Sequence, residues 1–373
     1  MQKTKVAIYG LTTEGYSIAS KIVDRAAVTI VDDTLQMAME LDPRTVKGHP
    51  SLQELVGGES LMGLKPISQV LSEARFVFFA PRLRKSGDES IIESNAKIRE
   101  VAKNVSKGTL VINTLPMGVG GNADNIAMIE KQTGLKVGGT LNYGYSPVRP
   151  GAEPGMVALF AKVRDAPSPE DLGMKSTSGD IISSELSYVS SVLEDGTRMA
   201  ADVELMRKAR GQKTDRGDSE ERYIDDLASL VYDLTAVQAS EDVGEPLTYL
   251  SGAALKSLDN HVRYIVDETR ELLRQMQLKA SRTRVVVAWS IDKYEMRADR
   301  MRTAESLAER LRDYVTDVKH VQMQTEEEIV DSYKHTVAIA CSAKDREWVL
   351  GLRRTGRAQE MTVLKATPSI SRE

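Results

Sequence analysis

The stretch Val6-Ala-Ile-Tyr-Gly-Leu-Thr-Thr-Glu-Gly-Tyr-Ser-Ile-Ala19 decides the fold of this chain. Its apolar start predicts a buried strand at residues 5–9, and the loop from Gly10 to Gly15 opens an amphipathic helix. A second apolar run at residues 27–31 predicts the next strand. Strand, glycine loop, helix and strand form a βαβ unit of the kind that binds dinucleotides.

The glycine loop carries the residue types that a bound pyrophosphate requires. Gly10 allows a tight turn, Gly15 allows the helix to pack closely on the strand, and the helix start presents unpaired N–H groups. Thr12 stands where the fingerprint has its middle glycine, so its side chain narrows the approach, although its hydroxyl can donate to phosphate. The expected cofactor contacts in this unit are Gly10, Thr12, Thr13, Glu14, Gly15 and Asp32.

Asp32 follows the second strand about 20 positions after the loop, where the fingerprint has its acidic residue. A carboxylate there accepts hydrogen bonds from ribose hydroxyls and repels a 2′-phosphate, which favours NAD over NADP. The alternative is a βαβ unit that binds no nucleotide.

Further strands and helices alternate regularly along the N-terminal half. Strands are expected at 75–80 and 109–113, with helices at 91–105 and 122–133. This alternation predicts an α/β fold whose N-terminal part is a Rossmann-like, doubly wound parallel sheet. Ligands in such sheets bind beyond the carboxyl ends of the strands.

Composition excludes several classes of protein. The chain has 373 residues with 41% hydrophobic content, so two or three domains are expected. The net charge of -4 predicts no nucleic-acid partner, and no apolar run is long enough to span a membrane. With one cysteine and four scattered histidines, neither a disulfide framework nor a metal site is expected. We therefore expect a cytoplasmic protein without a signal peptide.

Three segments in order resemble the nucleotide-sugar dehydrogenases, the family of UDP-glucose and UDP-N-acetylmannosamine dehydrogenases. They are the glycine-loop stretch, Leu110-Val-Ile-Asn-Thr-Leu-Pro-Met-Gly118 and Tyr145-Ser-Pro-Val-Arg-Pro-Gly151. The resemblance implies cofactor contacts at Pro81 and Thr114, and substrate contacts at Tyr145 and Arg149. It further implies NAD as cofactor, a nucleotide-sugar substrate and a homodimer. Taken singly, the later segments also fit a strand-end turn and a Pro/Gly corner.

The chain departs from the family at the residues that carry its chemistry. Val148 replaces a glutamate that positions water, and Tyr188, in Glu185-Leu-Ser-Tyr188, replaces the catalytic lysine. The Gly-Phe-Gly-Gly-x-Cys loop, whose thiol traps the aldehyde, is missing, and Cys341 is expected at a strand end instead. Lys256 has the Lys-x-x-x-Asn spacing but lies far along the chain, so a solvated surface lysine is its default interpretation.

The remainder is expected to contain helices and then a smaller α/β unit. Apolar residues at helical spacing predict a helical domain at 181–280 with a long helix at 247–278, after an NAD-binding domain at 1–160. The resemblance implies that this helical domain serves dimerisation, and the same stripes also fit a plain helical core. Residues 281–366 are expected to form a C-terminal α/β domain, followed by an unstructured tail at 367–373. Arginines in Asp299-Arg-Met-Arg302 either hold a diphosphate or lie on a solvated helix.

Three functions remain open from the sequence. The leading hypothesis is an NAD-dependent oxidoreductase that takes hydride from a sugar hydroxyl of a UDP-sugar. The second is a non-catalytic relative that binds NAD or a nucleotide sugar as a sensor or scaffold. The third is a two-electron reductase of the 6-phosphogluconate-dehydrogenase-like group.

Overall fold

The computed structural model describes residues 3–34, 37–58, 65–149, 155–161, 166–178, 181–209, 222–241, 244–323, 335–355 and 360–372. The chain divides into two compact units. The first contains Met1–Ser191, Thr235–Thr248 and Asp292–Ala298, and the second contains Val192–Leu234, Tyr249–Ile291 and Asp299–Glu373. The short segment Asp292–Ala298 therefore belongs to the first unit, although its sequence neighbours on both sides belong to the second.

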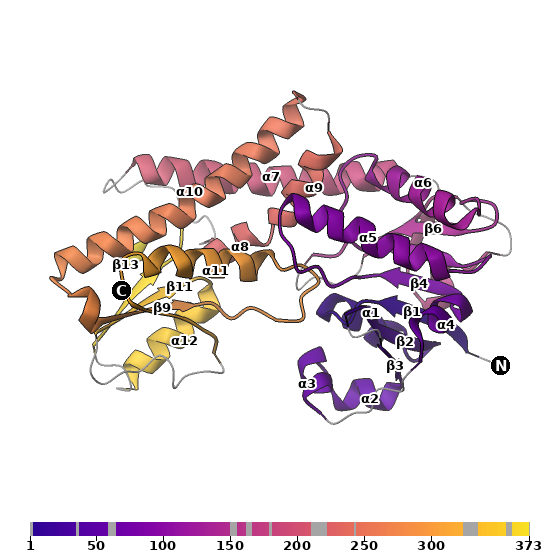
Figure 1. The fold of residues 1–373 in the computed structure, drawn as a ribbon, viewed down its shortest axis with the longest axis horizontal. Coiled ribbons are helices and arrows are strands. Elements are labelled where there is room, and N and C mark those ends of the chain that lie inside the picture. The colour runs from indigo at the N-terminus through magenta and orange to yellow at the C-terminus, as the bar shows by residue number, and fades with distance from the viewer. Residues whose placement is uncertain are drawn as a thin grey trace. The chain divides into compact units, whose positions relative to one another are not determined.

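The first unit is built on an eight-stranded sheet in the order β3-β2-β1-β4-β5-β6-β7-β8 (Figure 1). Strands β2, β1, β4, β5 and β6 are parallel, whereas β3 and β7 run antiparallel to β2 and β6. The strands are β1 (Thr4–Tyr9), β2 (Ala26–Asp32), β3 (Met37–Leu41), β4 (Phe76–Phe79), β5 (Leu110–Asn113), β6 (Asn142–Tyr145), β7 (Val157–Leu159) and β8 (Ser176–Ser178). The chain reverses its direction across the sheet between β1 and β4.

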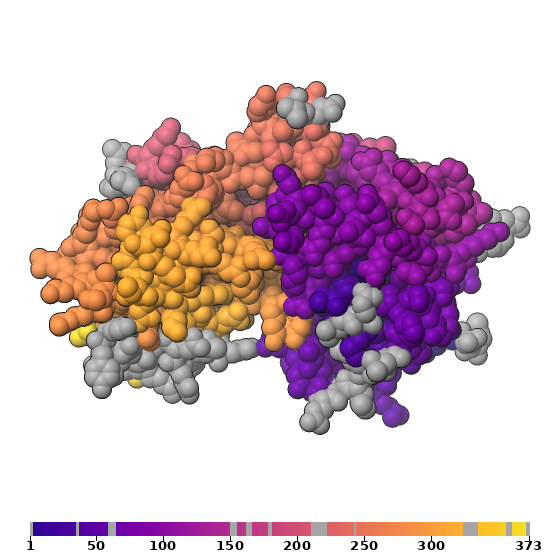
Figure 2. Space-filling view, in the orientation of Figure 1, coloured from indigo at the N-terminus to yellow at the C-terminus, as the bar shows by residue number. Residues whose placement is uncertain are grey.

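Helices cover both faces of this sheet because parallel crossovers are right-handed and the strand order reverses at β1. Helix α1 therefore lies on one face, while α5 and α6 pack against each other on the other. Figure 2 shows the purple and magenta side chains of α5 and α6 forming an outer surface of the first unit. The helices of this region are α1 (Thr13–Ile22), α2 (Pro43–Gly48), α3 (Leu52–Gly57), α4 (Ile67–Glu73), α5 (Asp88–Asn104), α6 (Gly121–Thr133) and the 3-10 turn η1 (Pro169–Leu172).

The second unit contains a five-stranded sheet in the order β10-β9-β11-β12-β13. Its first four strands are parallel and β13 is antiparallel, so the strand order reverses between β9 and β11. The strands are β9 (Thr283–Ala288), β10 (Asp317–Val321), β11 (His335–Ala340), β12 (Met361–Lys365) and β13 (Ser371–Arg372). The helices are α8 (Ile224–Ala228), α10 (Pro246–Gln275), α11 (Asp299–Arg312), α12 (Ala343–Arg354) and the turn η2 (Ala280–Arg282).

Three helices contribute residues to both units: α7 (Ile181–Lys208), α9 (Val231–Ser240) and α10, whose residues 246–248 belong to the first unit. Among the described residues, no helix combines the length and the apolar character needed to cross a bilayer.

The structure confirms the predicted fold class: a doubly wound parallel sheet, a helical middle region with a 30-residue helix, and a smaller α/β sheet. The domain boundaries at 160, 280 and 366 stay predictions. The expectation of an unstructured tail is wrong at its end, because Ser371 and Arg372 pair with Lys365 and Leu364 as an edge strand. Strand β3 was not expected, since its five residues do not alternate between apolar and polar side chains.

Candidate functional site

Gly10 is needed where β1 meets the end of β4. Its φ of +124° favours glycine, and a Cβ at this position would lie 1.9 Å from the carbonyl oxygen of Ala80. The Gly10 N–H donates to the Val31 carbonyl at 3.0 Å. The glycine is therefore required by the packing of neighbouring strand ends, whether or not a ligand binds.

The N–H groups at the start of α1 face acceptors from the chain itself. Thr12 is the N-cap, and its Oγ1 accepts the Gly15 N–H at 3.1 Å while donating to the Ala80 carbonyl. The Thr13 N–H donates to the Tyr294 carbonyl at 2.9 Å. The Thr13 and Gly15 N–H groups at this helix start are therefore paired within the chain.

Glu14 places a buried carboxyl group at the same turn. Its Oε2 accepts the Met296 N–H at 2.9 Å, and only 3% of the residue is exposed. Burial raises the pKa of the Glu14 carboxyl, against the lowering effect of hydrogen bonds from its own backbone and from Met296. This carboxyl group lies at the turn that a pyrophosphate would approach.

The segment Asp292–Ala298 supplies these contacts and lies across the point where the strand order reverses. Besides the contacts with Thr13 and Glu14, its Met296 carbonyl accepts the Leu83 N–H at 2.7 Å. Arg82 donates to the Lys293 carbonyl at 2.9 Å and lies over the Tyr294 ring at 5.5 Å. The segment is thus bonded to α1 and to the stretch after β4.

The fit of a dinucleotide is therefore incomplete in this conformation. Asp32, which the fingerprint assigns to the ribose, lies at the end of β2, where its Oδ1 accepts the Thr34 N–H at 2.8 Å. A pyrophosphate, however, would need the Thr13 N–H, which already donates to the Tyr294 carbonyl, and would approach the buried Glu14 carboxyl. The residues at the start of α1 therefore do not fit a pyrophosphate in this conformation.

The other predicted contacts are buried and bonded to the protein. Pro81 is buried. The Thr114 hydroxyl donates to the Phe79 carbonyl at 2.6 Å, and the Tyr145 hydroxyl accepts the Met117 N–H at 3.2 Å. Burial raises the pKa of Tyr145 well above its usual value. In this conformation these residues join strand ends and loops.

Arg149 and Tyr188 lie together at the position where the resembled family has its lysine. The Arg149 guanidinium lies 5.2 Å from the centre of the Tyr188 ring and donates to the Ser191 hydroxyl at 3.2 Å. A phenol in place of an ammonium removes a positive charge, and the neighbouring guanidinium restores one.

Glu185 is a contact that the sequence did not assign. Its buried carboxylate accepts the Gly120 N–H, the Asn122 N–H and the Asn122 side-chain amide, each at 2.8 Å. Gly120 has a φ of +82° and ends the turn before α6. The only sequence signal was the family's glutamate at this position, and the structure gives it the role of capping α6.

Lys256 lies on the solvent side of α10, as its default interpretation expected. Its side chain is 63% exposed and its Nζ is 3.5 Å from Asp259. Cys341 is fully buried at the end of β11, where burial and the nearby Asp345 and Asp225 carboxylates raise the pKa of its thiol. Neither residue has the surroundings of a reactive group.

The second unit has a cavity of about 500 Å³ next to the start of α12. Its lining includes two cationic side chains, Arg222 and Lys344, and the N-cap Ser342. The arginines expected to hold a diphosphate are engaged elsewhere: Arg300 donates to both oxygens of Asp225, and Arg302 donates to Glu305. Within the described ranges, no three His, Cys, Asp or Glu side chains group so as to hold a metal ion.

No protein-family model matches this sequence, and no curated protein matches it. Solved structures do match this chain. The UDP-D-ManNAc dehydrogenase of Pyrococcus horikoshii matches with a TM-score of 0.66 and 16% identity, over 99% of this chain and 96% of that chain. A UDP-glucose dehydrogenase of Pyrobaculum islandicum matches with 0.61 and 13%, over 98% and 94%. The chain therefore has the fold of nucleotide-sugar dehydrogenases over its whole length.

Proposed function

We propose that this protein is a non-catalytic relative of the nucleotide-sugar dehydrogenases. It binds a nucleotide-type ligand in its second unit and does not take NAD at its glycine loop. The observation that supports this most directly is the first turn of α1, where the Tyr294 carbonyl accepts the Thr13 N–H that a pyrophosphate needs.

Three departures from the resembled family agree with a lost reaction. Val148 is apolar and buried where the resembled family has a glutamate, so it cannot position water. Tyr188 cannot supply the charge of a lysine, and Cys341 is sealed inside the second sheet. Oxidation of an alcohol to an acid needs a base and a thiol at one site, and these residues supply neither.

The second-unit cavity is the proposed place for the ligand. It lies at the carboxyl end of β11, beside the reversal in strand order, which is where open α/β sheets bind ligands. The three carboxylates in its lining are held by the protein: Asp225 by Arg300, Asp226 by the Tyr223 N–H at 2.8 Å, and Asp195 by Arg198 at 3.2 Å. Lys344 and Arg222 supply positive charge for a diphosphate. The resemblance suggests a UDP-sugar.

Calorimetric titration of the full chain with UDP-glucose, UDP-N-acetylglucosamine and UDP tests this proposal. We expect saturable binding that Lys344→Gln weakens about tenfold. Lys256→Gln is the matched control, because Lys256 lies on α10 and does not line the cavity. Failure of all three compounds to bind would overturn the assignment of the ligand.

An NAD-dependent oxidoreductase is the second candidate, favoured by the likeness to dehydrogenases over the whole chain and by the retained Asp32. It requires the segment Asp292–Ala298 to leave the start of α1. The test is the absorbance of reduced nicotinamide when folded protein receives NAD and a panel of UDP-hexoses. Turnover with any sugar would replace the main proposal, and NADH counted per sugar would separate two-electron from four-electron oxidation.

A homodimer is the proposed assembly, from the resemblance and from apolar exposure on α7. Ile182 and Leu186 lie one helical turn apart and are 57% and 51% exposed. The chain has a mass of 41.1 kDa, and light scattering of the wild-type protein should give twice that mass. The double variant Ile182→Lys and Leu186→Lys should give the mass of one chain. A monomeric wild-type protein would contradict the proposal.

A further inference from the structure

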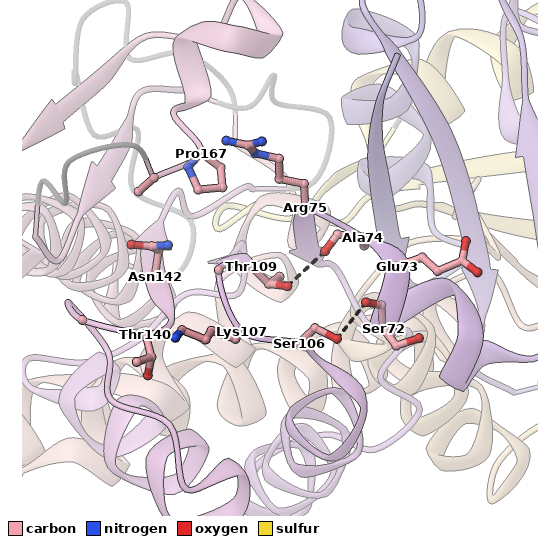
Figure 3. A pocket seen from close by; sticks show the side chains of 13 residues that line it. Ser72, Glu73, Ala74, Arg75, Ser106, Lys107, Thr109, Thr140, Asn142 and Pro167 are labelled. Carbon is pink, nitrogen blue, oxygen red and sulfur yellow. Dashed lines mark hydrogen bonds between the residues drawn. The ribbon is translucent and has the colours of Figure 1, made fainter. Parts of the chain in front are cut away.

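We propose that the first unit holds a separate binding site for a small oxyanion-bearing molecule, at the edge of its sheet where β4, β5 and β6 begin. A cavity of about 470 Å³ opens there (Figure 3). This volume lies within the range of about 300–1,000 Å³ that is usual for small-molecule sites. The glycine loop follows the end of the parallel strand β1, so the cavity lies at the opposite strand ends.

Asn142 is the residue that points to a ligand. It is the first residue of β6 and is 7% exposed, and its Oδ1 is buried with no hydrogen-bond partner. Figure 3 shows its amide group on the wall of the cavity, with the nitrogen turned to the side on which Thr109 and Arg75 lie. Leaving a buried acceptor unpaired costs about 1–3 kcal/mol, and a bound molecule with a hydroxyl group could donate to Oδ1 and remove that cost.

Two cationic side chains complete the site. Arg75 and Lys107 line the cavity and are exposed, and in the described part of the chain neither side chain has a hydrogen bond or ion pair. The one carboxylate in the lining, Glu73, is engaged by Lys5 at 2.6 Å and by Gln69 at 2.9 Å. These bonds lower the pKa of Glu73, and the negative charge of Glu73 is paired with Lys5. The cavity is therefore left with a positive character.

The hydroxyl groups around the cavity narrow the chemistry further. Ser106 donates to the Ser72 carbonyl at 2.8 Å and Thr109 donates to the Ala74 carbonyl at 3.0 Å, as the dashed lines of Figure 3 show. Ser72 donates to the Gln69 carbonyl. The free donors are therefore the guanidinium and the ammonium, and the free acceptor is the Asn142 Oδ1. Such a set matches a phosphate or carboxylate group whose molecule also carries an O–H that donates to Oδ1.

The site is independent of the proposed nucleotide ligand, since no residue that lines this cavity also lines the cavity of the second unit. Its occupancy is tested by calorimetric titration of the full chain, in a phosphate-free buffer, with inorganic phosphate, a hexose phosphate and citrate. The first variant is the double change Arg75→Gln and Lys107→Gln. The second is Asn142→Leu, which keeps the size of the side chain and removes its amide.

We expect saturable binding that weakens at least about tenfold in the double variant. Asn142→Leu should also weaken binding without lowering the melting temperature, because it removes an unpaired polar group. Lys131→Gln is the control: Lys131 is exposed on α6 and does not line the cavity. Tighter binding of the hexose phosphate than of inorganic phosphate identifies a phosphate ester, equal binding identifies free phosphate, and preference for citrate identifies a carboxylate.

Two results would overturn the proposal. One is the absence of saturable binding with all three compounds. The other is binding that the double variant and Asn142→Leu leave unchanged, which would assign it to another part of the surface.

Discussion

The two turns that begin α1 and α12 share a topology and differ in what surrounds them. Each follows a parallel strand near the point where its sheet reverses strand order, and each has a hydroxyl N-cap, Thr12 or Ser342. The start of α1 is closed by the segment Asp292–Ala298, in which the Tyr294 carbonyl accepts the Thr13 N–H and the Met296 N–H donates to Glu14. The start of α12 borders a cavity that Ala343 and Lys344 help to line.

The comparison separates a sequence fingerprint from a binding site. The turn with the recognisable glycine pattern is closed, and the turn without it is open. What closes the first is a segment that lies 279 positions further along the chain at Asp292. A local motif therefore identifies the fold of a βα turn, and remote residues decide whether a ligand can reach it.

The largest expected effect comes from Gly10→Ala. The added Cβ would meet the Ala80 carbonyl at 1.9 Å in a backbone with φ of +124°, so we expect a loss of about 4 kcal/mol in the free energy of unfolding. Urea denaturation measures it. Gly87→Ala is the control, because Gly87 also has a positive φ but no atom within 4 Å of a Cβ; it should cost only about 1 kcal/mol. If Gly10→Ala and Gly87→Ala lost equal stability, the packing of the strand ends would not explain the requirement for Gly10.

Acid should weaken the second unit through His261, which is fully buried on α10. Burial lowers its pKa from 6.5 to about 4, so the unfolded chain binds a proton that the folded chain refuses. The stability that His261 contributes by staying neutral is fully present above pH 6.5. As the pH falls toward 4, the free energy of unfolding should decrease by about 3 kcal/mol. His261→Leu should flatten that part of the stability curve. Parallel curves for the two proteins would contradict the assignment.

The two N-caps provide a matched pair. Thr12 is fully buried and makes two hydrogen bonds, so Thr12→Ala should cost about 2 kcal/mol. Ser342 is less enclosed, and Ser342→Ala should cost about 1 kcal/mol. Thermal unfolding measures both. A larger loss of stability in Ser342→Ala than in Thr12→Ala would contradict the contrast between a closed turn and an open one.

Thr12→Gly restores the middle glycine of the fingerprint and sharpens the comparison further. Since Tyr294 still occupies the Thr13 N–H, we expect no gain in NAD binding. A titration followed by NADH fluorescence checks it. Binding that appears only in this variant would make Thr12, and not the segment Asp292–Ala298, the barrier.

The smallest effect is expected for Lys256→Ala, which lies outside both turns. Its exposed side chain makes one ion pair at 3.5 Å, so the free energy of unfolding should change by no more than about 0.5 kcal/mol. Nucleotide binding should not change. A loss of binding would require a role for Lys256 that its surroundings do not suggest.

Much of the fold could be predicted because its signals are local. The buried strand at Val6 to Tyr9 and the long helix α10 each display their period within one stretch of sequence. The edge strands β3 and β13 were missed because they are short and owe their form to the neighbouring strand. Pairing of that kind leaves little trace in local composition.

The candidate site was harder to predict because its contacts are remote. The sequence placed Thr12, Glu14 and Asp32 correctly at one edge of the sheet, but it could not show that Met296 and Tyr294 reach the same turn. The role of Glu185 depends likewise on Gly120 and Asn122, which lie more than 60 positions away. No period or motif encodes such pairs.

Titration of the wild-type protein with NAD and NADH tests the central claim most directly. Fluorescence of the reduced form and calorimetry of the oxidised form give independent readings. The closed start of α1 predicts no saturable binding at NAD or NADH concentrations up to about 1 mM. A dissociation constant above about 1 mM corresponds to a binding free energy weaker than about 4 kcal/mol. Binding with a dissociation constant in the micromolar range, and weaker binding by Asp32→Ala, would contradict this account. That result would favour an NAD-dependent dehydrogenase.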